Sequence, residues 1–465
     1  MSKQHKNMGV IMESIALHNL GCKVNGYEMD VMQQILREKG YKIVPFDEKA
    51  DIYIINTCTV TNIADQKSRQ MLHRAKKKNP NAVVVAVGCY VQTGEEKIME
   101  DAAIDLVVGN NRKRDIAEIL EEYLTVQKSG TLPVKDKTLR SRTVIDINHT
   151  REYEEMQLTG TGGHTRAYVK IQDGCNQFCS YCIIPYARGR VRSRREEDIL
   201  AEVSGLVQTG YQEIVLTGIH ISSYGIDRGG SELLGLLEKL NAVDGLWRIR
   251  LGSLEPGIIT EEFAGKLSSL SKVCPHFHLS LQSGCDETLR RMNRRYTTGE
   301  YLEKVEILRR YFDRPAITTD VIVGFPGETE EEFASTEAFL EKVQFYEMHI
   351  FKYSKRQGTR AAAMKEQVAD RVKAERSGRL MRLEQRMSQE YRQSFVGENV
   401  QVLYEEAKKI GETVYQIGHT VRYIKVGRRA EGDFKNRILT ETLMGALQDD
   451  IMLAKEQDTV QIIKD

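Results

Sequence analysis

Residues 166–182 read RAYVKIQDGCNQFCSYC, a β-strand candidate (166–172) that runs directly into three closely spaced cysteines. The cysteines Cys175, Cys179 and Cys182 follow the pattern C-x3-C-x2-C. Three thiolates on one tight loop can hold three irons of a 4Fe–4S cluster and leave the fourth iron open. A structural zinc site would need a fourth protein ligand, and no further Cys or nearby His completes such a set. The loop therefore indicates an iron–sulfur site at the end of a strand.

Downstream of this loop, strand and helix candidates alternate in long units. The strand candidates are 166–172, 213–217, 247–251, 276–281, 318–323 and 347–351. Amphipathic helices are predicted between them at about 196–209, 231–243, 260–270, 299–311 and 329–342. Six successive βα units predict a partial (β/α)6 barrel rather than a closed eight-fold one. Its chemistry is expected at the carboxyl ends of the strands.

Upstream of the loop, shorter strand and helix candidates alternate as well. Nearly all-apolar runs at 51–56 and 82–87 are typical of strands buried on both faces of a parallel sheet, and 14–20 is a third candidate. This alternation predicts a doubly wound parallel sheet. One cysteine follows each strand candidate: Cys22, Cys58 and Cys89. Because ligands bind at the carboxyl ends of parallel strands, these three cysteines could meet at one edge.

The C-terminal part has a different pattern. A charged helix is predicted at 370–393, followed by short alternating runs at 399–404, 413–418, 421–426 and 438–443. Such runs split by glycine predict a small β-barrel. The expected domains are therefore 13–125 (the sheet domain), 126–160 (a linker), 161–393 (the barrel core) and 394–460 (the C-terminal barrel).

Composition narrows the class of protein. The 465 residues carry 67 basic and 66 acidic side chains, which excludes a uniformly basic nucleic-acid coat. No apolar run approaches the ~20 residues that span a bilayer, so no membrane association and a cytoplasmic location are expected. Eight cysteines are too few for a disulfide scaffold. We expect the remaining two, Cys274 and Cys285, to serve in packing or in a pocket wall.

The run CNQFCSYCIIPYARGRVRSR at 175–194, followed by the βα pattern, resembles the radical S-adenosylmethionine (SAM) methylthiotransferase family. The resemblance covers nearly the whole chain, and the C-terminal barrel is similar to the RNA-binding TRAM domain. It implies a second 4Fe–4S cluster on Cys22 (LGCKVN), Cys58 (INTCTV) and Cys89 (VGCY). The six cysteines are thus the metal ligands and catalytic candidates. The loop cluster would cleave SAM to a 5′-deoxyadenosyl radical, and the N-terminal cluster would carry the sulfur donor.

The resemblance also implies a SAM pocket at the top of the barrel. The candidate residues end three strands or border the cysteine loop: Tyr181, Thr217, Gly218, Ser280, Gln282, Gly324 and Glu328. Tyr181 would stack on the adenine, and glycine in the turn GFPGE (324–328) would allow the backbone to approach it.

Basic residues are locally concentrated in acid-free runs at 66–78, 188–195, 290–295 and 419–429. Together they predict a surface that tracks phosphates. Tyr415 and Tyr423 beside the last run would stack on unpaired bases.

Within the family, segments 216–225, 251–256, 281–297 and 351–362 look most like enzymes acting on N6-threonylcarbamoyladenosine beside the anticodon. This implies methylthiolation of carbon 2 of that nucleoside. The partners would be the tRNA anticodon stem-loop, a low-potential electron donor such as flavodoxin or ferredoxin, and a sulfur source. A threonylcarbamoyl carboxylate would need an Arg or Lys in the pocket.

Three alternatives remain open. Isopentenyladenosine in tRNA is disfavoured because Ile219–His220 stands where that branch has an Asn-containing motif. A ribosomal-protein aspartate is disfavoured by the basic run at 419–429. A non-catalytic RNA-binding protein with structural clusters would normally ligate those clusters fully.

Overall fold

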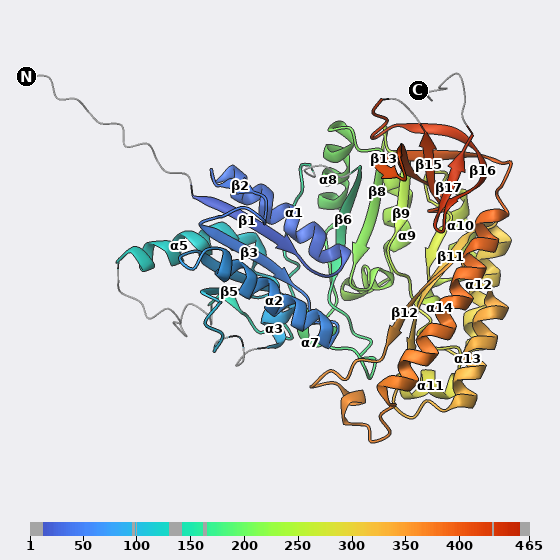
Figure 1. Ribbon diagram of the computed structural model, residues 1–465, viewed down its shortest axis with the longest axis horizontal. Coiled ribbons are helices and arrows are strands. Elements are labelled where there is room, and N and C mark those ends of the chain that lie inside the picture. The colour runs from blue at the N-terminus through green and yellow to red at the C-terminus, as the bar shows by residue number, and fades with distance from the viewer. Residues whose placement is uncertain are drawn as a thin grey trace, which may run out of the picture. The chain divides into compact units, whose positions relative to one another are not determined.

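A computed structural model describes residues 13–94, 98, 100–129, 142–160, 165–429 and 432–455 (Figure 1). The chain forms two compact units. The first contains the described residues up to 158 together with 183–190, and the second contains the remainder. Parts of the expected domains, at 130–141, 161–164 and 456–460, lie outside the described residues.

The first unit is built on a five-stranded parallel sheet in the order β2-β1-β3-β4-β5, which confirms the predicted doubly wound architecture. The strands are β1 (Ser14–Asn19), β2 (Lys42–Val44), β3 (Ile52–Thr57), β4 (Val83–Gly88) and β5 (Leu106–Val108). The helices are α1 (Lys23–Glu38), α2 (Asn62–Lys78), α3 (Cys89–Thr93) and α5 (Ile116–Ser129). Strands β2 and β5 were not predicted, because three-residue strands carry too little pattern.

The central strands form the core of this unit. Every residue of β3 and β4 is buried, as their apolar sequences predict. On one face, Tyr53 and Ile55 pack with Val84 and with Leu72 of α2. Residues 142–158, which we expected to be part of a linker, cluster with this unit.

The second unit contains the predicted partial barrel of six parallel strands. They are β6 (Arg166–Asp173), β8 (Glu213–Gly218), β9 (Arg248–Leu251), β10 (His276–His278), β11 (Ala316–Val323) and β12 (Glu347–Lys352). Two sheets carry them, and single parallel bridges from Ile249 to Val273 and from Leu254 to Leu279 join β9 to the β10 side. The short β7 (Arg192–Ser193) pairs antiparallel with β6.

Helices connect these strands close to where the sequence predicts them. They are α8 (Glu196–Gln208), α9 (Leu233–Asn241), α10 (Glu261–Ser269), α11 (Asp286–Arg291), α12 (Thr298–Tyr311), α13 (Glu330–Val343) and α14 (Asp370–Gln393). Helices α12 and α13 each begin with a capping box, in which Thr297 pairs with Glu300 and Thr329 with Glu332. Such boxes satisfy backbone N–H groups that the first helical turn leaves without partners.

Residues 399–454 form a closed barrel in the order β13-β14-β15-β17-β16, which confirms the predicted small β-barrel. Its strands are β13 (Asn399–Ile410), β14 (Thr413–Thr420), β15 (Lys425–Arg429), β16 (Ile438–Gln448) and β17 (Ile451–Ala454). The strand predicted at 421–426 is misplaced, because β15 begins only at Lys425. Tyr423 has a φ of +66°, and the Ile424 N–H donates to Thr420 Oγ1, so the chain turns here before β15 starts.

The small barrel contacts the partial barrel through buried arginines. Arg250 donates to the carbonyls of Thr420 and Val421 and to the carboxylate of Glu213. Its guanidinium lies 4.8 Å from the ring centroid of Tyr423, a cation–π contact. The prediction that Tyr423 stacks on RNA bases is therefore wrong, because its ring also stacks on His419 within the protein.

No helix among the described residues is long and apolar enough to cross a membrane.

Candidate active site

The three-cysteine loop of the second unit directly follows β6 and is anchored by the segment after α11. Gly174 turns the chain with a φ of +75°, which favours glycine. The Ser180 N–H donates to the Met292 carbonyl at 2.9 Å, and the Ser180 hydroxyl donates to the Arg291 carbonyl at 2.8 Å. Asn293 Nδ2 donates to the Phe178 carbonyl at 3.1 Å. These bonds fix the loop before any ligand is bound.

One cysteine of this loop receives a hydrogen bond from a buried arginine. Arg294 Nη1 donates to Cys179 Sγ at 3.2 Å, and Arg294 Nη2 lies 2.9 Å from both oxygens of Glu255. Burial by itself would raise the pKa of Glu255, but nearby His220, 3.5 Å away, and the charge of Arg294 outweigh it and lower that pKa. The Glu255 carboxylate is thus ionised and holds the guanidinium against the sulfur.

This donor set suits an iron–sulfur cluster better than a single ion. Ligands of one zinc ion lie about 2.0–2.3 Å from it. Among the described residues, the three sulfurs do not converge within 4.8 Å as such ligands would. Burial raises the pKa of Cys175 to about 11, so ligand binding must displace its proton. Arg294 also places a positive charge 3.2 Å from Cys179 Sγ, which complements the negative charge of a sulfur that ligates iron.

The dispersed cysteines of the first unit follow adjacent parallel strands. Cys22 comes after β1, Cys58 directly follows β3, and Cys89 begins α3 after β4. The backbone at Gly21, next to Cys22, closely approaches Cys58. A Cβ at position 21 would lie 3.0 Å from the Cys58 Cβ and 3.1 Å from the Cys58 Sγ. Burial raises the pKa of Cys58 to about 11, and the other two thiols are near enough to raise it further. The sheet edge therefore gathers the three residues.

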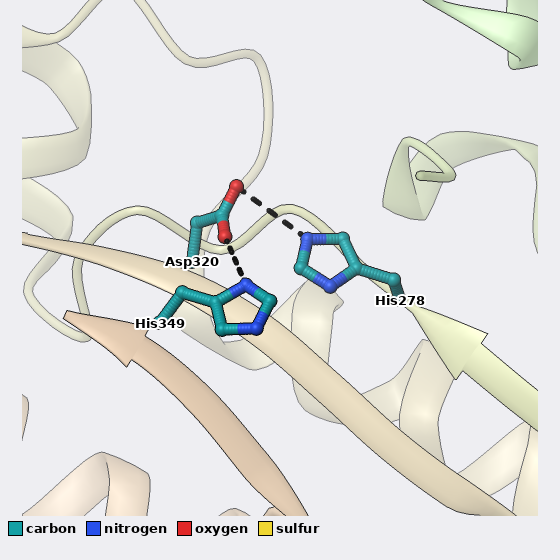
Figure 2. Close-up of side chains that lie close together, drawn as sticks. All are labelled: His278, Asp320 and His349. Atoms are coloured by element: carbon teal, nitrogen blue, oxygen red, sulfur yellow. Dashed lines mark hydrogen bonds and ion pairs between the residues drawn. The ribbon is translucent and has the colours of Figure 1, made fainter. Parts of the chain in front are cut away.

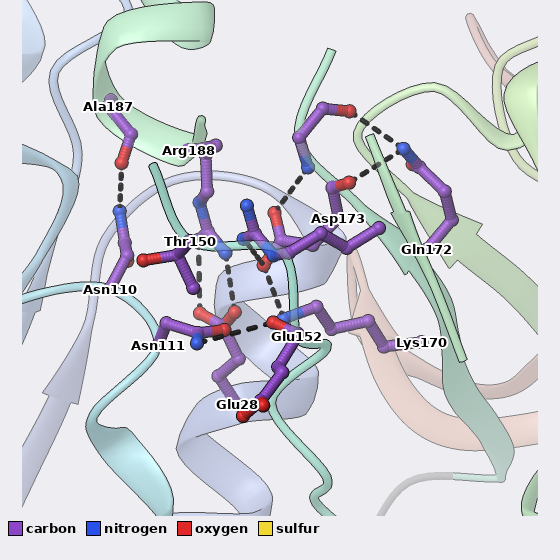
Figure 3. Close-up of polar contacts among 12 residues, drawn as sticks. Glu28, Asn110, Asn111, Thr150, Glu152, Lys170, Gln172, Asp173, Ala187 and Arg188 are labelled. Carbon is purple, nitrogen blue, oxygen red and sulfur yellow. Dashed lines mark hydrogen bonds and ion pairs between the residues drawn. The ribbon is translucent and has the colours of Figure 1, made fainter. Parts of the chain in front are cut away.

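Cys89 lies beside a buried polar network of the first unit, in which Arg188 bonds Glu28 and Asn110 bonds the Ala187 carbonyl (Figure 3). Arg188 Nε donates to Cys89 Sγ at 3.2 Å, and Arg188 Nη1 donates to Glu28 at 2.5 Å. Lys113 also forms an ion pair with Glu28, and Asn110 Nδ2 lies 3.5 Å from Cys89 Sγ. Arg188 belongs to α7 (Ile184–Arg188), the short helix that follows the cysteine loop in sequence.

The charges of this network fit an anionic group. The side chains of Arg188, Lys113 and Glu28 are all at least 99% buried, and both cations contact the Glu28 carboxylate. Arg188 also places its positive charge 3.2 Å from Cys89 Sγ. Thiolates on Cys22, Cys58 and Cys89 that ligate a cluster would be complemented by this charge, so the residues present fit such a group.

The proposed SAM-pocket residues lie at the carboxyl ends of their strands. Thr217 and Gly218 end β8, and a Cβ on Gly218 would lie 2.9 Å from Gln172 Oε1. Tyr181 meets Phe325 edge-on, with ring centroids 6.5 Å apart. This contact brings the cysteine loop to the turn after β11.

The remaining pocket candidates have partners within the protein. Ser280 accepts a hydrogen bond at its carbonyl from the Tyr296 hydroxyl at 2.6 Å. Gln282 has a φ of +74°, a conformation that non-glycine residues adopt mainly at functional or strained positions. Glu328 accepts from the Gly324 N–H at 2.6 Å and from Arg376 at 2.7 Å. Glu328 therefore shapes the turn that contains Gly324.

Comparisons with known proteins agree with this geometry. Residues 14–109 match the uncharacterized protein family UPF0004, and residues 169–340 match the radical SAM superfamily. The threonylcarbamoyladenosine tRNA methylthiotransferase MtaB of Bacillus subtilis is 40% identical over 94% of this chain and 94% of its own. The chain belongs to the radical SAM methylthiotransferase family. Residues 14–109 lie in the first unit, and residues 169–340 lie in the second unit except for 183–190.

Two further proteins show how the likeness extends. The tRNA-2-methylthio-N(6)-dimethylallyladenosine synthase of Moorella thermoacetica is 39% identical over 84% of this chain and 86% of its own. The solved radical SAM methyltransferase TsrM of Kitasatospora setae is 16% identical, with a TM-score of 0.52 over 74% of this chain and 72% of its own. That structural likeness shows the fold alone.

Sequence reasoning missed the arginines at the two cysteine sites. It assigned the runs 188–195 and 290–295 to a phosphate-tracking surface, but Arg188, Arg192 and Arg194 are buried. Arg194 pairs with Glu202 at 2.5 Å, and Arg294 points at Cys179. The surface hypothesis is wrong for these residues because their side chains are buried or bonded within the protein, which the sequence pattern did not reveal. The closeness of 188–194 to the cysteine motif was the one available signal of a role at a site.

The other two cysteines, Cys274 and Cys285, belong to the second unit. Cys274 is buried near the charged side chains of Arg250 and Glu213, which agrees with a role in packing. Cys285 is the N-cap residue of α11.

Proposed function

We propose that this chain is a tRNA methylthiotransferase that modifies carbon 2 of N6-threonylcarbamoyladenosine next to the anticodon. The observation that carries the proposal is the pair of three-cysteine sites, each with an arginine on one sulfur, in a chain 40% identical to MtaB over nearly its full length. Carbon 2 of adenine is unreactive toward acid–base side chains, so cofactors must supply the chemistry.

The proposed cofactors are SAM and two 4Fe–4S clusters. Cys175, Cys179 and Cys182 would hold one cluster, and Cys22, Cys58 and Cys89 the other. When bound, these groups supply reductive cleavage of SAM and delivery of sulfur. The chain's own part is positional: Arg294 holds Cys179 and Glu255, and Arg188 holds Cys89 and Glu28.

The proposed SAM pocket uses Tyr181, Thr217, Gly218, Ser280 and Gln282 at the strand ends, with Gly324 and Glu328 forming its turn. A low-potential donor such as flavodoxin or ferredoxin and a separate sulfur source would complete the reaction. The tRNA anticodon stem-loop would be the substrate-bearing partner.

A second candidate substrate is N6-dimethylallyladenosine, because a synthase that bears this name is 39% identical over most of the chain. The two nucleosides differ at the N6 substituent, which is charged in one and apolar in the other. A charged substituent needs a cation in its pocket, whereas an apolar one needs apolar walls.

Nucleoside mass spectrometry distinguishes the two. tRNA is analysed from a bacterial strain lacking this gene, from the same strain with the gene restored, and from one with a Cys179→Ala copy. We expect 2-methylthio-N6-threonylcarbamoyladenosine only with the intact gene. Appearance of the methylthiolated dimethylallyl nucleoside instead would replace the substrate. Absence of either product, with the unmodified tRNA unchanged, would overturn the proposal.

A further inference from the structure

Three metal-ligating side chains meet on the strands β10, β11 and β12 of the second unit (Figure 2). His278 ends β10, Asp320 lies in β11 and His349 in β12. In the sheet register, His278 lies opposite Thr318, and Asp320 lies opposite His349. Because side chains alternate along a strand, these residues share one face of the sheet.

This face is turned away from α12, one of the helices that cover the barrel. The neighbouring residue Phe277 packs on Phe312 at the end of α12. Thr319 bonds the hydroxyl of Tyr301, a residue of α12. Residues one position along each strand point the other way, so the cluster faces the interior of the partial barrel.

The three side chains converge on one point. Asp320 Oδ1 lies 3.2 Å from His349 Nδ1, and Asp320 Oδ2 lies 3.5 Å from His278 Nε2. One ligand atom from each residue lies within 4.8 Å of the other two. Tetrahedral ligands about 2.0–2.1 Å from a zinc ion are about 3.4 Å apart. The two separations from Asp320 are close to this value, although each involves a different carboxylate oxygen.

His278 is oriented as a ligand before any ion is present. Its Nδ1 lies 3.0 Å from Thr318 Oγ1, which fixes the ring. Its Nε2 is buried and has no hydrogen-bond partner, because 3.5 Å from Asp320 is too long for one. Ligating histidines commonly bond through the second ring nitrogen in this way.

The charge at the cluster also favours a cation. Asp320 places a carboxylate between the two imidazoles, 3.2 Å from His349 Nδ1 and 3.5 Å from His278 Nε2. Glu347 lies two residues before His349 on the same strand face and adds a second acidic group. Arg392 and Lys425 act on Glu347 from outside the cluster, and Lys425 is itself paired with Asp450.

We propose that His278, Asp320 and His349 form a mononuclear site for a divalent transition ion of the zinc class. Two imidazoles and one carboxylate are ligands that such ions accept. None of the three proposed ligands is a cysteine. Three protein ligands leave a fourth position for water or another oxygen donor from the barrel interior. His349 is 59% exposed in its side chain, so an ion can reach the site from solvent.

The test measures zinc binding to the full-length protein with both iron–sulfur clusters reconstituted anaerobically. Zinc and iron are counted by mass spectrometry after dialysis, and affinity is measured by calorimetry with Zn²⁺ alone. The variants are His349→Gln and Asp320→Asn. The matched control is His73→Gln, because His73 forms a similar His–Asp pair with Asp101, at 2.8 Å, on the first unit.

We expect one zinc per chain in the wild type and in the control. Each cluster variant should bind zinc at least about a hundredfold more weakly, with its iron content unchanged. X-ray absorption at the zinc edge should show only nitrogen and oxygen ligands. Zinc that persists in both variants, sulfur in its coordination shell, or no zinc bound to the wild type would each overturn the proposal.

Discussion

The two cysteine sites reach a similar end by different routes. In the second unit the cysteines lie on one loop of eight residues, whereas in the first unit they are spread over 68 positions and three strands. In both, an arginine donates to one sulfur at 3.2 Å and is held by a glutamate. A site on one loop therefore depends on local anchoring, whereas a dispersed site depends on the pairing register of a whole sheet.

The arginines also differ in their surroundings. Arg188 shares Glu28 with Lys113, and all three are almost completely buried. Arg294 shares Glu255 with His220 and donates from Nε to the Tyr296 hydroxyl, and the Glu255 side chain is 15% exposed. Because a buried charge gains more from its partner than a hydrated one, the first site should depend more strongly on its glutamate.

The largest expected effect separates the two sites by removing their ligands. Anaerobically reconstituted wild type should contain about eight irons, four per cluster. Replacing Cys22, Cys58 and Cys89 with Ala should leave about half of the iron and preserve cleavage of SAM, but abolish the methylthiolated product. Replacing Cys175, Cys179 and Cys182 should also halve the iron but abolish both reactions.

Iron content and 5′-deoxyadenosine formation are the measurements. Cys274→Ala is the control for loss of a buried cysteine. Equal loss of SAM cleavage in both triple variants would show that the first site supports folding instead of sulfur delivery.

The next effect compares the two glutamates. Glu28→Gln leaves Arg188 and Lys113 buried without a carboxylate, and breaking such a pair costs about 3–5 kcal/mol. The thermal midpoint of the cluster-loaded protein should fall by on the order of 10 °C. Glu255→Gln should lower it less, because Glu255 and its partners are nearer solvent.

Differential scanning calorimetry measures both midpoints. Glu262→Gln is the control, because its pair with Lys266 is exposed on α10 and should leave the midpoint unchanged. A larger drop for Glu255→Gln than for Glu28→Gln would reverse the comparison.

A smaller effect concerns the hydrogen bonds to sulfur. Arg294→Lys removes the fork that joins Cys179 to Glu255. Hydrogen bonds to cluster sulfurs stabilise the reduced form, so the potential of the loop cluster should fall. A loss of about 1 kcal/mol corresponds to roughly 40 mV for one electron.

Spectroscopic redox titration measures this shift, and Arg188→Lys should lower the potential of the other cluster in the same direction. Arg290→Lys is the control, because Arg290 is exposed and pairs with Glu287 on α11. An unchanged potential in both arginine variants would limit these residues to folding.

The smallest effect lies outside both sites, in the adjacent residues Arg428 and Arg429 of β15. Arg428 is buried, and its Nη1 lies 2.8 Å from Glu441 Oε1, whereas Arg429 is exposed. Arg429→Ala should lower the salt slope of tRNA binding by about one unit, if that surface contacts a phosphate. Arg428→Ala should lower the thermal midpoint and leave the slope unchanged. Binding of tRNA across a salt series checks both, and equal slopes in all three proteins would show that β15 makes no phosphate contact.

Much of the fold follows from local sequence pattern. Helix α14 occupies 370–393 as predicted, because its apolar positions recur at helical spacing among charged residues over many turns. The strand predicted at 421–426 is misplaced because a turn at Tyr423 depends on a bond from Ile424 to Thr420. Periodicity reports which residues face a core, but it does not report where a local hydrogen bond stops a strand.

The sequence by itself determined the loop site, because Cys175, Cys179 and Cys182 lie within eight residues and no distant contact is needed to gather them. It also placed Cys22, Cys58 and Cys89 at the ends of parallel strands. Only the tertiary structure decided the roles of Arg188 and Arg294, whose carboxylate partners lie 160 and 39 residues away. The energy of an ion pair depends on distance and burial, and neither can be read from the order of residues along the chain.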